Sequence, residues 1–213
     1  MQSRLDRAVQ KHVLSHLLDR GMRGVEPLRG ELLRDVGGRV VEIGFGTGSN
    51  LAHYPREGLE ELVAIEPAEG LAQLAKERLD RWTLETRIPT RLTVASGTRP
   101  IDLESGTYDV VVITFVLCSV RHPEAMLAEA RRLLRPEGRL VIAEHVAAPR
   151  GLRRRAQRVA RPLWKTLLAG CDPLTDARTS IERAGFDHST LEDRRLDLPW
   201  LVRTGLVGTT RPR

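Results

Sequence analysis

Val40-Val41-Glu42-Ile43-Gly44-Phe45-Gly46-Thr47-Gly48-Ser49-Asn50 is the stretch of sequence that decides the fold. Its first four residues are typical of a buried strand, and three glycines at alternate positions follow directly. Glycine adopts backbone conformations that other residues avoid, and it lets a ligand approach the main chain closely. The stretch therefore predicts a strand that ends in a tight ligand-binding turn, followed by a helix whose first N–H groups are free.

Apolar runs alternate with helical patterns along the rest of the chain, which is typical of a parallel sheet covered by helices. The expected helices cover Leu71 to Leu79, His122 to Leu134 before an Arg-Pro-Glu-Gly turn, and 176–184. The predicted fold is α/β, a doubly wound, mostly parallel seven-stranded sheet in a three-layer α/β/α arrangement. Its expected strands are Arg39–Ile43, Leu62–Ile65, Arg91–Ala95, Tyr108–Thr114 and Arg139–Glu144, with a closing pair near Ser189–Leu196 and Leu201–Thr209.

The chain has 213 residues, enough for one domain with a sizeable core, and it shows no repeat or long linker. We divide this single domain into N-terminal helices at 1–36, a cofactor-binding core at 37–146, and a lid helix with closing strands at 147–213. No apolar run approaches the roughly 20 residues that span a bilayer, and the N-terminus does not resemble a secretory signal. We therefore expect a cytoplasmic protein.

The net charge of +6 raises the question of nucleic acid, but outside 150–165 the basic residues are interspersed with Asp and Glu. Because no nucleic-acid module accompanies them, we do not expect nucleic acid as a partner. Two cysteines make neither a disulfide framework nor a zinc site, and we expect no metal. Cys118 is interpreted as a small packed residue rather than a nucleophile, and no role is assigned to Cys171.

Glu42 distinguishes between the ligands that a glycine turn can hold. In a dinucleotide site the start of the helix faces a pyrophosphate, and a carboxylate two residues before the first glycine would lie close to that anion. The third glycine also comes one residue too early for the dinucleotide pattern. A carboxylate here favours a cationic ligand, and S-adenosylmethionine carries an ammonium and a sulfonium group and no phosphate.

A second carboxylate supports this interpretation. The second predicted strand ends at Ile65-Glu66-Pro67, 22 residues after Gly44. An acidic residue at this point in nucleotide-binding sheets accepts hydrogen bonds from the ribose hydroxyls. Glu66 is therefore expected to hold the ribose of the ligand.

The motifs Val-Glu-Ile-Gly-Phe-Gly-Thr-Gly, Ala-Ile-Glu-Pro, Tyr-Asp-Val-Val-Val and Leu-Arg-Pro-Glu-Gly-Arg-Leu together resemble those of the class I methyltransferases, over about 35–146. The resemblance implies a Rossmann-like fold and S-adenosylmethionine as cofactor. It also implies that Ser96 to Thr98 lie against the adenine and that Thr114 to Val116 lie near the methionine part. The expected cofactor-binding residues are Glu42, Gly44, Phe45, Gly46, Thr47, Gly48, Asn50, Glu66, Pro67, Ser96, Gly97, Thr98, Thr114, Phe115 and Val116.

A narrower resemblance lies downstream. The segments 114–120, Glu144-His145-Val146-Ala147-Ala148, and 170–175 with Trp164 are similar to the methyltransferase-like seven subgroup, and the similarity continues through 181–186 and 198–200. That subgroup is membrane-associated and methylates small alkyl thiols, which implies a small-molecule thiol acceptor here. Its N-terminal hydrophobic anchor has no counterpart in this sequence. The alternatives are N-, O- or C-methylation of a phospholipid, quinone or other metabolite, a nucleotide-binding oxidoreductase, and a non-catalytic cofactor-binding module.

The acidity of thiols also favours a thiol acceptor over an alcohol. A thiol with a pKa near 8.5 is a few per cent ionised at neutral pH and requires only modest activation, whereas an alcohol requires a stronger base. His145 follows the fifth predicted strand and is the candidate general base or acceptor-orienting residue, with a purely structural role as the alternative. His12, on a predicted N-terminal helix, is a further candidate for acceptor contact.

The segment Gly151–Ala169 predicts an amphipathic helix that Pro162 is expected to kink. Leucines, Val159 and Trp164 form one stripe, and arginines occupy the other positions. Three interpretations are open: a helix packed over the sheet edge with a basic solvated face, a lid over an apolar acceptor pocket, or weak peripheral contact of 150–169 with an anionic membrane.

Overall fold

A computed structural model describes residues 20–213 and contains one seven-stranded sheet with the order β3-β2-β1-β4-β5-β7-β6. All neighbouring strands are parallel except β7, which runs antiparallel to both β5 and β6. The predicted doubly wound, mostly parallel sheet is therefore confirmed. Its strands are β1 (Gly38–Ile43), β2 (Leu59–Ile65), β3 (Thr90–Thr93), β4 (Tyr108–Thr114), β5 (Leu134–His145), β6 (Glu192–Arg195) and β7 (Thr204–Thr210).

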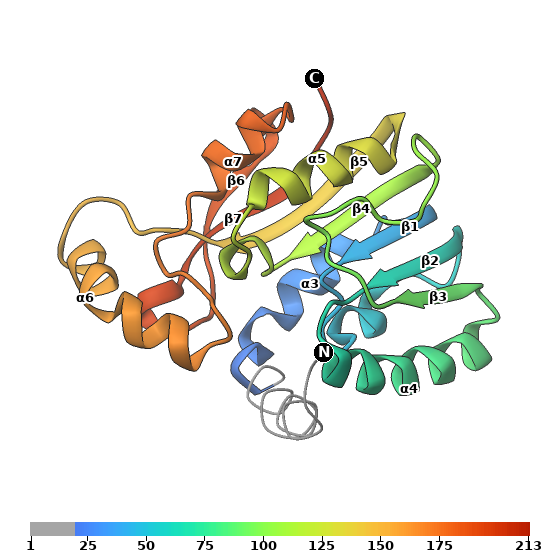
Figure 1. Ribbon diagram of the computed structural model, residues 1–213, viewed down its shortest axis with the longest axis horizontal. Coiled ribbons are helices and arrows are strands. Elements are labelled where there is room, and N and C mark those ends of the chain that lie inside the picture. Colours follow the sequence, from blue (N-terminus) through green and yellow to red (C-terminus); the bar gives the residue numbers. More distant parts are fainter. Residues whose placement is uncertain (1–19) are drawn as a thin grey trace.

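Helices cover both faces of the sheet, which gives the three layers visible in Figure 1. On one face, Val40 and its neighbours pack with Leu33 and Leu79 of helices α3 and α4, and on the other, Val41 packs with Leu127 of α5. Val40 and Val41 pack on opposite faces of the sheet because successive side chains of a strand point to opposite sides. The helices are α3 (Glu26–Leu33), α4 (Glu69–Thr86), α5 (Pro123–Leu133), α6 (Leu152–Leu167) and α7 (Ala177–Arg183), with 3₁₀ helices η2 (Arg23–Val25), η3 (Ser49–His53), η4 (Leu117–Ser119), η5 (His188–Thr190) and η6 (Trp200–Val202).

Several strand ends differ from the sequence-based expectation. β3 ends at Thr93 instead of residue 95, and the two closing strands are shorter than expected. β5 begins at Leu134 because the expected Arg-Pro-Glu-Gly turn is accommodated inside it. The pairing with β4 jumps from Leu134 to Arg139, so residues 135–138 form an irregularity in a continuous strand.

The helix expected directly after the glycine turn is replaced by the short 3₁₀ helix η3. Gly48 has a left-handed φ of 82° and accepts the N–H of Leu51 at 3.1 Å, which starts the 3₁₀ turn. Pro55 then limits its length, since the residue before a proline avoids helical conformation, and Tyr54 is extended. The free N–H groups of a full α-helix are therefore not available at this site.

Helix α6 lies apart from the sheet at one end of the molecule (Figure 1). Gln157 is its one buried residue: its side-chain oxygen accepts from the Ala148 N–H at 2.9 Å and its Nε2 donates to the Leu201 carbonyl at 2.7 Å. Leu152 and Val159 in the apolar stripe are 77% and 84% exposed. The interpretation of α6 as a helix packed over the sheet edge by its apolar stripe is therefore wrong.

Two further expectations concern the N-terminal part and the membrane. The predicted N-terminal helix with His12 lies outside the described residues. Within residues 20–213, no helix combines the length and apolar content needed to cross a bilayer.

Candidate active site

The glycine turn leaves β1 at the carboxyl edge of the parallel strands. Gly44, Gly46 and Gly48 all have positive φ values, 82°, 58° and 82°. A Cβ on Gly44 would lie 2.3 Å from Cγ2 of Val116, so this glycine is required by close packing of β1 against the segment after β4. A Cβ on Gly46 would meet nothing within 4 Å. The backbone at Gly46 therefore faces open space in which a ligand fits.

Glu66 lies at the end of β2 beside this space. One carboxylate oxygen accepts the Gly46 N–H at 2.8 Å and the other accepts the Ala68 N–H at 2.8 Å. Burial raises the pKa of Glu66, and these two N–H groups partly counteract it. Because a carboxylate oxygen has two lone pairs, both oxygens keep an acceptor position. The two backbone bonds fix the carboxylate beside Gly46.

Glu42 is buried near the end of β1, below the glycine turn. Tyr54 OH donates to Oε2 at 2.7 Å and Asn50 Nδ2 donates to Oε1 at 2.9 Å. Burial raises the pKa of Glu42 to about 7, although Tyr54, Arg29 and Asn50 each lower it. Glu42 therefore holds Asn50 and Tyr54 by hydrogen bonds. Its carboxyl group, which ionises near neutral pH, lies below the glycine turn.

Arg29, on α3, belongs to the same network of side chains, and the sequence-based prediction missed it. It is buried, it donates to Asn50 Oδ1 and, at 3.3 Å, to Thr114 Oγ1, and it lies 5.5 Å from the centroid of the Phe115 ring. Its position in the sequence could have indicated its burial. Arg29 is four residues from both Val25 and Leu33, so it lies on the buried face of its helix.

The segment after β4 lies beside this network. Phe115 has a left-handed φ of 58°, a conformation that costs energy for a residue with a side chain, and its N–H bonds the Ala143 carbonyl at 2.7 Å. Such strain is found preferentially at functional sites. Side-chain contacts join Thr114 and Phe115 to Asn50 and Arg29, so these four residues form one cluster at the end of β4.

The remaining expected contacts differ in environment. Gly97 is buried against Ile43, whose Cγ2 would lie 2.3 Å from an added Cβ, and Ser96 Oγ lies 2.8 Å from Thr98 Oγ1. This turn is therefore held close to β1, beside the glycine segment. Phe45 packs in the core on the α4 face, Thr47 is buried, Val116 is half-buried, and Pro67 is exposed.

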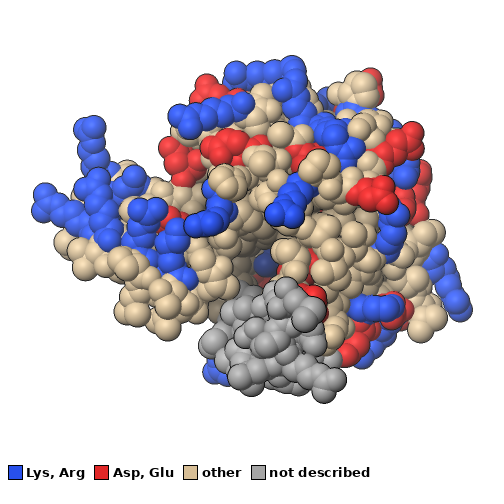
Figure 2. Space-filling model, viewed as in Figure 1, with Lys and Arg blue, Asp and Glu red and all other residues tan. Residues whose placement is uncertain are grey.

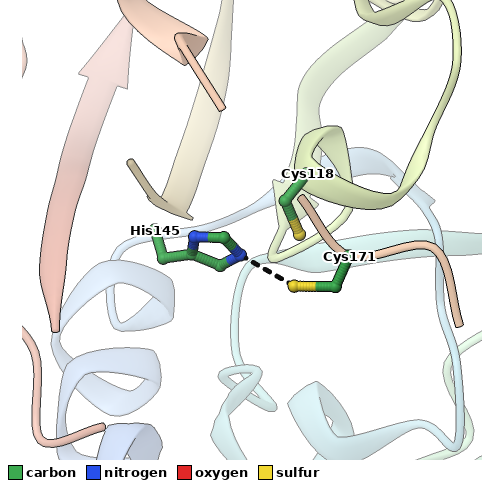
Figure 3. Close-up of side chains that lie close together, drawn as sticks. All are labelled: Cys118, His145 and Cys171. Carbon is green, nitrogen blue, oxygen red and sulfur yellow. Dashed lines mark hydrogen bonds between the residues drawn. The ribbon is translucent and has the colours of Figure 1, made fainter. Parts of the chain in front are cut away.

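A second cluster lies at the ends of β4 and β5, and it was not expected from the sequence. His145 Nε2 lies 3.0 Å from Cys171 Sγ, and the indole N–H of Trp164 donates to the same sulfur at 3.4 Å. Cys118 completes the group, and the three side chains point toward one another in Figure 3. The prediction that Cys171 has no role missed this convergence, because the cysteine reaches the site only on the chain returning from α6.

The cluster shifts the pKa values of its two thiols in opposite directions. Hydrogen bonding from Cys118 and then from His145 lowers the pKa of Cys171, in spite of burial. The bond to Cys171 and then burial raise the pKa of Cys118 well above its usual value. Burial alone would lower the pKa of His145, but Cys171 and Glu144 outweigh it and raise that pKa. The pKa of the Cys171 thiol is thus lowered beside a histidine whose own pKa is raised.

Comparison with known proteins agrees with this geometry. Residues 41–142 match a family model described as a methyltransferase domain. The chain is 32% identical to the thiol S-methyltransferase TMT1B of Rattus norvegicus over 89% of this chain and 80% of that protein. It is 35% identical to the thiol S-methyltransferase TMT1A of Homo sapiens, over 79% and 68% of the two chains. The crystal structure of the methyltransferase CalH with SAH superposes with a TM-score of 0.65 at 22% identity, over 99% of this chain and 62% of that chain.

Fold, glycine turn and strand-end acid define a class I S-adenosylmethionine-dependent methyltransferase. Within this class, the chain belongs to the family of the TMT1A and TMT1B methyltransferases. It is a methyltransferase, and S-adenosylmethionine is the cofactor of this class.

Proposed function

We propose that this methyltransferase transfers the methyl group to the sulfur of a small-molecule thiol. The observation that carries the proposal is the similarity to TMT1A and TMT1B, both named thiol S-methyltransferases, over more than two thirds of their length. The side chains at the end of β5 support it, because the imidazole of His145 lies beside two sulfur atoms. This surrounding suits a soft, polarisable acceptor atom better than an alcohol.

The cofactor-binding residues expected from the sequence are proposed to act as one constellation around the glycine turn. S-adenosylmethionine supplies the methyl group as part of a sulfonium cation. Glu66 accepts the ribose hydroxyls, the backbone at Gly46 leaves room for the ligand, and Glu42 supplies negative charge below the turn. Residues 96–98 border the adenine, and residues 114–116 border the methionine part. Most of the rate then comes from holding donor and acceptor in line.

His145 is proposed to act on the acceptor. It is 4% exposed at the end of β5, and its Nδ1 is buried without a hydrogen-bond partner among the described residues. A buried polar atom of this kind is costly unless it gains a hydrogen-bond partner. A thiol near the imidazole needs little additional activation to react as the thiolate.

The acceptor prediction is tested by a matched panel with isotopically labelled S-adenosylmethionine. An alkyl thiol, the alcohol and the amine of the same chain length, a phenol, a quinol and a phosphatidylethanolamine vesicle are compared. We expect label in the thiol alone, with a rate that rises with pH as the thiol ionises. Calorimetric binding of S-adenosylmethionine serves as the control for a folded enzyme. Transfer to the amine, quinol or lipid with an inert thiol would contradict the proposal.

We also propose that the protein is cytoplasmic and that α6 makes peripheral contact with an anionic membrane. Leu152, Val159, Leu163 and Leu167 form an exposed apolar stripe. Arginines occupy the other side of α6, as the blue and tan regions at the left of Figure 2 illustrate. An exposed apolar stripe flanked by positive charge is complementary to the interface of a bilayer that contains anionic lipid.

Vesicle co-sedimentation measures this contact. We expect binding to vesicles with anionic lipid that weakens with salt, and a loss of about tenfold on the double change Leu163→Ser and Leu167→Ser. Leu84→Ser is the matched control, because Leu84 is equally exposed but lies on α4. Equal sedimentation of the wild-type protein and the double variant would contradict the contact.

A further inference from the structure

We propose that Cys118, His145 and Cys171 bind one Zn²⁺ ion whose fourth coordination position receives the acceptor thiol. The metal site stands on the geometry of the three side chains. The role of its fourth position rests on the proposed thiol methyltransferase function.

Three segments that are distant in sequence bring the ligands together. Cys118 lies in η4 after β4, His145 is the last residue of β5, and Cys171 follows α6. Their ligand atoms all lie within 4.8 Å of one another. Two thiolates and one imidazole are among the ligand sets that zinc prefers, and three protein ligands with an open position are typical of catalytic zinc. This arrangement is more specific than a pair of cysteines in a core.

The spacing needs little adjustment. Tetrahedral zinc with bonds of about 2.3 Å to sulfur and about 2.0 Å to nitrogen holds its ligand atoms roughly 3.5 to 3.8 Å apart. His145 Nε2 and Cys171 Sγ are now 3.0 Å apart, and the whole group spans no more than 4.8 Å. Movements below about 1 Å, within the rotamer freedom of cysteine, therefore complete the site.

The neighbouring carboxylates have partners of their own. Glu144 accepts the N–H groups of Leu117 and His145 at 2.7 and 3.2 Å and also interacts with the thiol of Cys118. Asp172 forms ion pairs with Arg161 and Lys165. No fourth His, Cys, Asp or Glu within residues 20–213 joins the group. An external ligand must therefore complete a tetrahedron.

The surroundings suit metal-bound thiolates. The Trp164 indole N–H donates to Cys171 Sγ at 3.4 Å, and outer hydrogen bonds of this kind orient first-shell ligands. Two thiolates neutralise the charge of the ion in a buried place, where an uncompensated charge is costly. Cys118 and His145 are buried, whereas Cys171 is half-buried, so an ion and a thiol approach from its side.

The chemistry follows from the open position. An incoming thiol binds through sulfur and releases its proton to solvent, since zinc-bound thiols are deprotonated. A sulfur lone pair then forms the new bond to the methyl carbon. The carbon–sulfonium bond of S-adenosylmethionine breaks, and its electron pair remains on the departing sulfur. The thioether product is neutral and a weak ligand, so it leaves the ion.

Metal binding is tested on the full chain, reduced and loaded with Zn²⁺ or Co²⁺, by elemental analysis and by visible spectroscopy. We expect about one ion per chain, with the charge-transfer and d–d bands of tetrahedral Co²⁺ bound to thiolate. Cys118→Ser and Cys171→Ser should each lower metal content at least fivefold. S-adenosylmethionine affinity should change less than twofold, which verifies folding. His122→Asn, which removes an exposed imidazole, is the control and should keep the metal.

The outcomes separate the two parts of the proposal. An alkyl thiol that strengthens the cobalt charge-transfer band, while the matched alcohol does not, supports the fourth position. Thiol methylation at full rate by chelator-treated, metal-free protein would overturn the thiol-binding role and leave the proposed function intact. Wild-type protein that binds S-adenosylmethionine but no more metal than the variant lacking both cysteines would overturn the site. A Cys118–Cys171 disulfide whose reduction restores no metal binding would overturn it as well.

Discussion

Replacing Glu66 by alanine is expected to weaken S-adenosylmethionine binding roughly one-hundred-fold, because two hydrogen bonds from the ribose to a charged acceptor are lost. The same change frees the Gly46 and Ala68 N–H groups that the carboxylate now holds, at 2.8 Å each. The glycine turn therefore also loses the side chain that fixes it. Isothermal titration calorimetry with the cofactor measures the effect.

Glu60→Ala is the matched control for this experiment, because Glu60 is on the same strand but exposed. Its affinity should equal that of the wild-type protein. Thermal unfolding of Glu66→Ala distinguishes a lost ligand contact from a collapsed fold. An affinity within threefold of wild type in the folded variant would refute the ribose assignment.

Glu42→Gln is expected to change how stability depends on pH in the absence of cofactor. The pKa of Glu42 is raised from 4.5 to about 7 in the folded protein, chiefly by burial. Between these values the unfolded chain releases the proton and the folded protein keeps it, so wild-type stability falls as pH rises. The loss amounts to about 3 kcal/mol, from 1.36 kcal/mol per pH unit, and it ends above pH 7.

Glutamine cannot ionise, so the variant escapes this loss while keeping an oxygen that accepts from Tyr54 or Asn50. Urea unfolding across this pH range should show similar stabilities at the acidic end and a more stable variant above pH 7. Glu60→Gln should follow the wild-type curve. A stability difference between Glu42→Gln and wild type that stays constant with pH would refute a buried, proton-binding Glu42.

The fold was predictable because its signals are local. Glycine at 44, 46 and 48 directly after a β-branched run indicates a strand that ends at a tight turn, and Glu66 follows the next strand at the same edge. Strand bounds were less predictable, since irregular pairing at 135–138 and the short β3 depend on neighbours that no local pattern specifies.

The site was predictable only where residues follow a strand. Glu66 directly follows β2 and His145 ends β5, so the topology alone places them at one edge of the sheet. Side-chain contacts bring Arg29 and Tyr54 to the site, and the segment that returns from α6 brings Cys171 there. No local sequence pattern specifies these contacts or the path of that segment. The amphipathic pattern of α6 likewise indicated an apolar stripe, but it did not indicate that this stripe is exposed to solvent.

The antiparallel strand β7 has a consequence for how the protein is made. It pairs with β5 along Leu140–His145, so it lies inside the sheet although the ribosome synthesises it after every other strand. Until Thr204–Thr210 emerge, β5 presents a bare apolar edge that invites pairing with other nascent chains. We therefore expect the sheet to close only after β7 has emerged.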